Sequence, residues 1–141
     1  MLALVLVCAA PAPARASTSF SGDRMMDAVN WVRAQAGLRP LKQSRRLIRS
    51  SAARAGLMMR ADFFAHPSRL RVPTFQRVGE VLELHSGRRA RVNRTLRRWA
   101  DSPAHREVIT ARHFRWIGAA RATGRFRGQR ATIWVVRFGR R

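Results

Sequence analysis

Hydrophobic residues recur at helical spacing through the first half of the chain, and two helices are predicted there. The first covers residues 23–36, where one face collects the apolar side chains and Gly37 then ends the helix. The second covers residues 44–60 and carries arginines on the face opposite its apolar stripe. The apolar positions of the first helix are Met25, Ala28, Val29, Val32 and Ala36.

The pattern is less regular in the middle of the chain. Residues 73–78 are predicted as a short helix, and residues 80–85 as a strand or an irregular segment. Helical spacing returns over residues 92–100 and again over residues 103–110. Ser102 precedes a proline and is expected to be the N-cap of this last helix, because proline is tolerated at the first helical position.

The hydrophobic period changes at the C-terminal end from helical to strand-like. The segments "RWIGAARA" (115–122) and "ATIWVVRFG" (131–139) are rich in β-forming residues. Gly124 and Gly128 lie between them, so an antiparallel hairpin is expected. With helices first and a hairpin last, we predict a single α+β domain over residues 23–139.

The N-terminus has the pattern of an export signal. An apolar run over residues 2–10 is followed by small residues ending in an A-x-A pattern, which predicts a signal peptide over residues 1–16 with cleavage near Ala16. The run is far shorter than the roughly 20 residues of a membrane span. A short polar lead is expected over residues 17–22.

Charge and cysteine content limit the possible classes of function. The net charge is +22, and 28 of the 29 cationic residues are arginines, with Lys42 the exception. Cleavage would remove Cys8, the only cysteine, and Arg15, which lowers the net charge to +21. An exported chain without disulfides suggests a bacterial protein secreted from the cell or held in its envelope. The arginines reflect either a biased coding sequence or a surface that binds polyanions.

Histidines and scarce carboxylates supply the candidate chemistry. His66, Glu80 and His105 come from three segments, and two histidines with one carboxylate could form an open zinc site with water as the fourth ligand. His105 in a first helical turn is expected to be neutral, since the helix dipole disfavours a positive imidazole there. Alternatively, both histidines are hydrogen-bonded and partly buried, and Glu80 pairs with an arginine.

Other kinds of chemistry lack support in the sequence. The mature chain has no cysteine nucleophile, no G-x-S-x-G elbow and no glycine-rich phosphate loop. Ser102 is therefore interpreted as a helix cap and not as a nucleophile. The tryptophans fall on apolar stripes and are assigned to the core, so no specific nucleic-acid recognition is expected. They are Trp31, Trp99, Trp116 and Trp134.

Six segments carry a recognisable order of motifs along the chain. They are "AVNWVRAQAGLRPL" (28–41), "DFFAHPS" (62–68), "RVGEVLELHSG" (77–87), "LRRWADSPAHREVIT" (96–110), "HFRWIGAARA" (113–122) and "IWVVRFG" (133–139). The most specific motif is the W-x-x-S-P-x-H-R pattern that contains His105. Taken in this order, the segments resemble the CAP superfamily, also called SCP or cysteine-rich secretory proteins, in its short bacterial form.

The resemblance implies an α-β-α sandwich with a central antiparallel sheet. It also implies that His66, Glu80 and His105 converge on a surface cleft where family members often bind a divalent metal, most often zinc. Asp101 and Ser102 are weaker candidates for the same cleft. The sequence departs from the family pattern in having a valine after Glu80, where the motif has asparagine, and no clear match to a second glutamate.

Three functions follow as hypotheses. The first is an exported, monomeric CAP-domain binding module that acts outside the cell or at the cell wall on a small or lipid ligand, without being an enzyme. The second is a metal-assisted hydrolase that uses a zinc-bound water. The third is a basic protein that binds a cell-wall polymer or another polyanion through its arginines.

Overall fold

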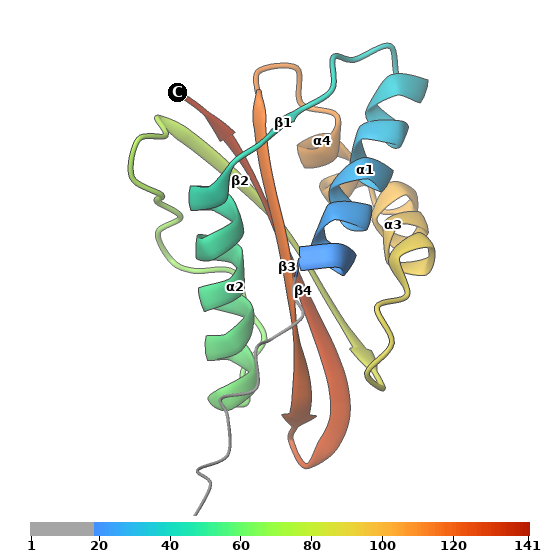
Figure 1. Ribbon diagram of the computed structural model, residues 1–141, viewed down its shortest axis with the longest axis vertical. Coiled ribbons are helices and arrows are strands. Elements are labelled where there is room, and N and C mark those ends of the chain that lie inside the picture. Colours follow the sequence, from blue (N-terminus) through green and yellow to red (C-terminus); the bar gives the residue numbers. More distant parts are fainter. Residues whose placement is uncertain (1–18) are drawn as a thin grey trace, which may run out of the picture.

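The computed structural model describes residues 19–141 and shows a four-stranded sheet between two layers of helices (Figure 1). The predicted signal peptide, residues 1–16, lies outside the described residues. Within residues 19–141 no helix combines the length and hydrophobicity needed to cross a membrane. The elements are α1 (Ser19–Gln35), β1 (Lys42–Gln43), α2 (Arg45–Arg60), β2 (Arg77–Ser86), α3 (Val92–Asp101), α4 (Pro103–Ile109), β3 (Trp116–Phe126) and β4 (Gln129–Arg140).

The sheet has the strand order β1-β3-β4-β2. The predicted hairpin is confirmed, since β3 and β4 pair antiparallel, and β2 adds to the other side of β4 in antiparallel register. Glu80 of β2 lies opposite Arg137 of β4 in that register. The short strand β1 pairs in parallel with the start of β3 and was not predicted, because two exposed polar residues carry no hydrophobic period.

Alternation along the strands divides the apolar residues between two cores. On β4, Trp134 and Val136 face α1, α3 and α4, whereas Ile133 and Val135 face α2. Figure 1 shows α2 alone on one face and the other three helices on the opposite face. The α-β-α sandwich is therefore confirmed, and both faces of the sheet are covered. Arg137 lies on the same face of β4 as Ile133 and Val135, and its guanidinium contacts Ser50 of α2.

The packing of α2 on the sheet depends on one glycine. At Gly118 of β3 an added Cβ would overlap the backbone of Leu47 and Ile48. The Ser51 hydroxyl donates a hydrogen bond to the Gly118 carbonyl at 3.0 Å, from a fully buried position. A small residue here lets the helix lie directly on the strand, which places the end of α2 and the loop that follows it near β2.

Several predicted elements differ from those observed. Helix α1 begins at Ser19, so the described part of the predicted polar lead is helical. The predicted helix over residues 73–78 is wrong: Thr74 has a positive φ of 75°, a turn forms there, and β2 begins at Arg77. Strand pairing with β4 outweighs the local helical pattern in this segment, because Gln76 already donates its backbone N–H to the carbonyl of Arg140 on β4.

Candidate functional site

The candidate site is built around Glu80 on the edge strand β2. The loop after α2 carries His66 to this strand, and His66 Nδ1 lies 2.9 Å from Glu80 Oε1. From the other side, Arg137 donates its Nε hydrogen to Glu80 Oε2 at 2.8 Å. An ionised carboxylate can only accept hydrogen bonds, so Nδ1 of His66 is the protonated nitrogen in this pair. Both oxygens of Glu80 are therefore engaged.

The three side chains of this cluster differ sharply in exposure. Glu80 is fully buried, and Arg137 is 8% exposed, whereas His66 is 57% exposed. Arg137 also donates to the Ser50 carbonyl at 3.3 Å and to the Ser50 hydroxyl, so α2 holds the guanidinium in place. A buried carboxylate is tolerated because a matched cation and hydrogen bonds compensate it. The alternative in which Glu80 pairs with an arginine is thus the one observed.

His105 lies in the first turn of α4, as expected. Its Nδ1 is buried and has no hydrogen-bond partner among the described residues. Burial, and to a lesser degree the nearby His66, lower the pKa of His105. The ring lies 6.4 Å from that of Trp99, centroid to centroid. His105 is therefore neutral near pH 7, as predicted, but burial and not the helix dipole is the main cause.

The arrangement does not fit a three-ligand metal centre. Among the described residues no group of three or more His, Cys, Asp or Glu side chains is placed to hold a metal ion. Both oxygens of Glu80 already accept a hydrogen bond, from His66 and from Arg137, so the imidazoles of His66 and His105 are the remaining candidate ligands. Two ligands fall short of the three or four protein ligands that zinc sites in proteins contain. The zinc site that the resemblance implies stays a prediction.

The two weaker candidates, Asp101 and Ser102, lie at the junction of α3 and α4. Asp101 is exposed and is the last residue of α3. Ser102 is the N-cap of α4 with extended backbone, as predicted, but its side chain makes no capping hydrogen bond. In the part of the chain that the structure describes, neither residue makes a hydrogen bond or ion pair to His66, Glu80 or His105.

A second site, which was not predicted, is a groove between α1 and α3. The groove has a volume of about 490 Å³. Trp31 is 63% exposed beside it, so its assignment to the core is wrong. One signal was present in the sequence, because Trp31 is not among the apolar positions that define the stripe of its helix. The lining residues are Ala28, Trp31, Val32, Asn93, Leu96, Arg97 and Ala100.

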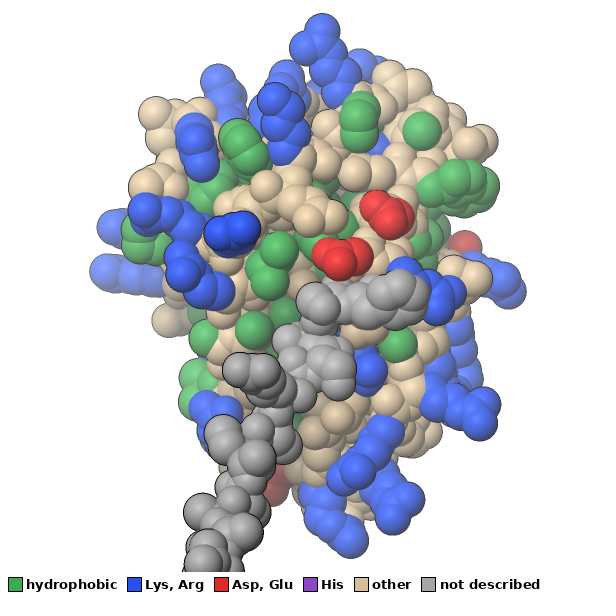
Figure 2. Space-filling model, viewed as in Figure 1, with side chains coloured by type: hydrophobic (Ala, Val, Ile, Leu, Met, Phe, Trp, Pro, Cys, Tyr) green, Lys and Arg blue, Asp and Glu red, His purple; other side chains and the backbone are tan. Residues whose placement is uncertain are grey.

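Positive charge is spread over the surface with little compensation. Figure 2 shows Lys and Arg side chains across the visible face and around its outline, with few carboxylates between them. Within residues 19–141 the structure contains two ion pairs between an arginine and a carboxylate, Arg137–Glu80 and Arg98–Glu83. Any ligand that approaches this protein meets a positive field, which favours anions.

Comparison with known proteins gives a consistent result. Residues 26–138 match the model of the cysteine-rich secretory protein (CAP) family. The search of curated proteins found no match.

Solved structures agree in fold. An outer surface protein from Borrelia burgdorferi is 20% identical, with a TM-score of 0.69 over 84% of this chain and 91% of that chain. An extracellular protein containing an SCP domain from Bacillus anthracis is 18% identical, with a TM-score of 0.67 over 88% of this chain and 41% of that chain. Venom allergen-like protein 4 of Schistosoma mansoni is 13% identical, with a TM-score of 0.69 over 86% of this chain and 89% of that chain. At these identities the likeness establishes a shared fold.

Proposed function

The chain belongs to the cysteine-rich secretory protein (CAP) family, and from that premise we propose that it is an exported binding module that carries a small anionic amphiphile. Export is supported by the N-terminal signal pattern and by two similar structures that are described as an outer surface and an extracellular protein. The ligand is an apolar chain with one negatively charged end, of the kind found in fatty acids.

The groove between α1 and α3 carries this proposal. Its lining is mostly apolar, and the exposed ring of Trp31 extends that apolar surface. An exposed tryptophan beside an apolar groove is characteristic of a ligand-binding surface, because the ring gains free energy when a ligand covers it. Arg97 and Asn93 are the polar members of the lining. An apolar chain would contact Trp31 and Leu96, and its anionic end would pair with Arg97.

Fluorescence quenching tests the groove directly. A brominated fatty acid quenches tryptophan emission at short range, so the wild-type protein is expected to lose the emission of its exposed tryptophan on titration. The Trp31→Phe variant should lose this quenching but keep its fold by circular dichroism. Unchanged quenching in Trp31→Phe would show that the ligand binds elsewhere. No quenching in the wild type would overturn the proposal.

Calorimetry with lauric acid tests the charged end of the ligand. Arg97→Gln is expected to weaken binding by about tenfold, the effect of losing one charge-assisted hydrogen bond. Arg94→Gln is the matched control, since it removes the same charge from the same helix but does not line the groove. Equal weakening in both variants would mean that net charge, and not the groove, attracts the ligand.

Hydrolysis is a second candidate function, and the geometry of His66 favours it. The hydrogen bond to Glu80 fixes the ring and leaves Nε2 as the basic nitrogen on a side chain that is 57% exposed. A carboxylate-oriented histidine of this kind can act as a general base toward water. We expect any esterase activity to disappear in His66→Ala and to survive in His85→Ala, whereas equal activity in both variants would exclude this role.

A further inference from the structure

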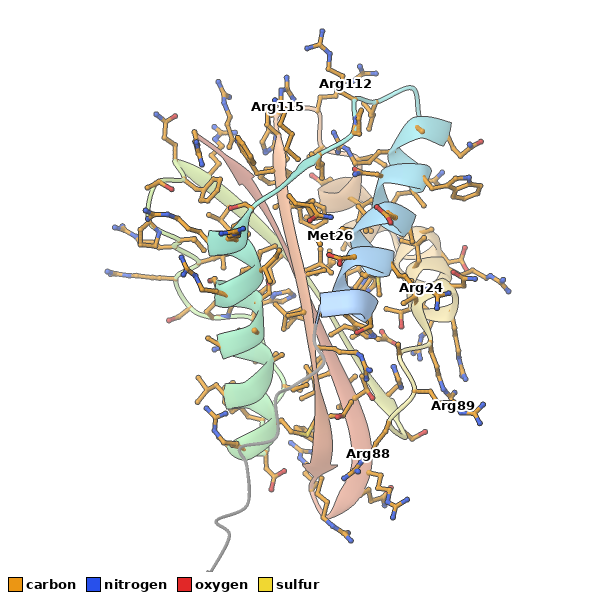
Figure 3. The ribbon with its side chains drawn as sticks, viewed as in Figure 1. Arg24, Met26, Arg88, Arg89, Arg112 and Arg115 are labelled. Atoms are coloured by element: carbon orange, nitrogen blue, oxygen red, sulfur yellow. The ribbon has the colours of Figure 1, made fainter. Side chains whose placement is uncertain are left out.

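A second pocket lies at the end of the molecule where β1, β3 and the C-terminal end of β4 meet. It has a volume of about 400 Å³, and three of its five lining residues are arginines. Figure 3 shows Arg112 and Arg115 at this end, opposite the end that carries Arg88 and Arg89. The pocket is lined by His113, Arg115, Trp116, Arg140 and Arg141. Cations therefore converge here from a loop and a strand end.

The cations of this pocket are held by groups other than carboxylates. Arg115 donates from Nη1 to the carbonyl of Phe114 at 2.9 Å and also to that of Arg112. The guanidinium of Arg141 lies 4.5 Å from the centroid of the Trp116 ring, in cation–π geometry. These contacts fix the positions of the guanidinium groups, and among the described residues no Asp or Glu side chain forms an ion pair with them.

Like charges also face each other across the sheet at this end. Arg140 lies opposite Arg77 in the antiparallel register of β2 and β4. Direct pairing of like charges destabilises a sheet unless another charge compensates it. Burial is the largest cause that lowers the pKa of His113, and both of these arginines, followed by Arg115 and Arg33, lower it further. The protein alone thus holds several positive groups close together at a cost in stability.

A buried arginine lies behind the pocket and adds to the positive potential. Arg33 of α1 is 1% exposed and donates from Nη1 to the carbonyls of Ile109 at 2.7 Å and Ala111 at 3.1 Å. Burial, and to a lesser degree the nearby Arg115, lower its pKa. The carbonyl groups satisfy its hydrogen bonds but do not neutralise its charge. Within residues 19–141 the ion pairs lie at Glu80 and Glu83, and none involves an arginine of this pocket.

We propose that the pocket formed by His113, Arg115, Arg140 and Arg141 binds a phosphate group, independently of the ligand in the α1–α3 groove. Planar guanidinium groups match the oxygens of a phosphate, and a dianion compensates more of this charge than a single carboxylate does. The Trp116 ring is covered by Arg141 and approached by Lys42, so it is not free to stack on a nucleobase. The recognised group is therefore the phosphate itself.

Calorimetry with pyrophosphate tests this site on the full chain, because pyrophosphate carries the proposed group with no attached base or lipid. The wild type is expected to bind at one saturable site at moderate salt. Arg140→Gln should weaken binding by about tenfold or more. Arg89→Gln is the matched control, because it removes the same charge from the opposite end of the molecule (Figure 3). No binding by the wild type, or equal weakening in both variants, would overturn the proposal.

Proton NMR of the histidine rings gives a second readout that nonspecific attraction would not reproduce. A bound dianion favours the imidazolium form, so the pKa of His113 should rise on addition of pyrophosphate, and chloride at equal ionic strength should not reproduce the rise. His113→Asn assigns the resonance. A pKa of His113 that does not move while pyrophosphate binds would place the anion elsewhere and overturn the proposal.

Binding to lipid vesicles distinguishes a lipid headgroup from a soluble phosphate compound as the source of the phosphate. Co-sedimentation with phosphatidylcholine vesicles that contain phosphatidic acid, lost in Arg140→Gln but kept in Arg89→Gln, would support the pocket with a lipid headgroup as the source. Binding of free pyrophosphate without such co-sedimentation would support the pocket with a soluble phosphate compound as the source. Co-sedimentation that both variants retain, together with no binding of pyrophosphate, would overturn the proposal.

Discussion

Arg137 Nε lies 2.8 Å from Glu80 Oε2, and these two side chains, opposite each other on adjacent strands, are 8% and 0% exposed. The pair joins the strand that carries the candidate site to the strand at the centre of the fold. Because the carboxylate is compensated from inside the protein, Glu80 acts as a structural anchor that orients His66. This relationship determines how the cluster responds to mutation.

Removing Arg137 should destabilise the protein strongly. Arg137→Met leaves a buried carboxylate with only His66 as partner, and breaking a buried pair in this way costs about 3–5 kcal/mol. The free energy of unfolding from urea titration measures the loss. Adding Glu80→Gln to the same chain should recover part of it, because a neutral amide needs no counter-ion. A double variant no more stable than Arg137→Met would contradict this explanation.

Arg98→Met is the control for the loss of an arginine as such. Arg98 pairs with Glu83 at 3.0 Å, but its side chain is 56% exposed. The Glu83 side chain is only 11% exposed, but a pair whose cation is open to solvent is screened by water and salt and contributes about 1 kcal/mol or less. We therefore expect a small loss of stability in Arg98→Met, well below that of Arg137→Met. Equal losses would show that burial of the Glu80 pair is not what matters.

An added methyl group should have opposite effects on stability at Gly118 and at Gly56. Gly118→Ala would push a Cβ into the backbone of Leu47 and Ile48, which cannot move without separating α2 from the sheet, so a loss of about 3 kcal/mol or more is expected. Gly56→Ala in α2 meets only the flexible end of Arg60 and should stabilise the helix by up to about 1 kcal/mol. Thermal unfolding of both variants checks the pair, and a stable Gly118→Ala would refute the close packing.

The fold was largely predictable because the spacing of hydrophobic residues differs clearly between the helical and the strand segments. Periods near 3.6 indicated all four helices, and strand-like segments indicated the hairpin, whose positive φ values at Arg127 and Gly128 give it a tight turn. Strand β1 and the turn at Thr74 were not predictable from periodicity. Both depend on pairing with distant strands, which a local hydrophobic pattern does not encode.

The sequence suggested candidate site residues, but it could not give the geometry in which they meet. The motif pattern located His66, Glu80 and His105, and the structure brings His66 and Glu80 into contact. The partner that compensates Glu80 could not be chosen from the sequence, because Arg137 is one of many arginines and strand register selects it. The exposure of Trp31 depends on how α1 and α3 pack, so the groove appears only in three dimensions.

Stability should fall as the pH drops below the ordinary histidine pKa near 6.5. Burial lowers the pKa of His105 in the folded state, so between its unfolded and folded pKa values the unfolded chain binds a proton that the folded chain does not. The free energy of unfolding therefore decreases with falling pH through this window. His113 contributes in the same direction.

Urea unfolding at a series of pH values between about 7.5 and about 5 measures this effect above the range where most carboxylates titrate. His105→Gln removes the titrating group and should make the pH dependence shallower than in the wild type. His113→Gln should do the same, and the two reductions should add, because the residues contact different parts of the fold. A wild type that becomes more stable toward pH 5 would contradict the sign of these pKa shifts.

Zinc should bind weakly or not at all to the wild-type protein. The ion would need a third protein ligand beside His66 and His105, and Arg137 and His66 already hold the two oxygens of the buried Glu80. Calorimetric titration of zinc into metal-free protein is therefore expected to show no tight site, and a chelator should leave the thermal unfolding midpoint unchanged. His105→Ala should behave like the wild type in this titration. Tight binding of one zinc ion per chain, abolished in His105→Ala, would instead show that the Glu80–Arg137 pair opens to admit the metal.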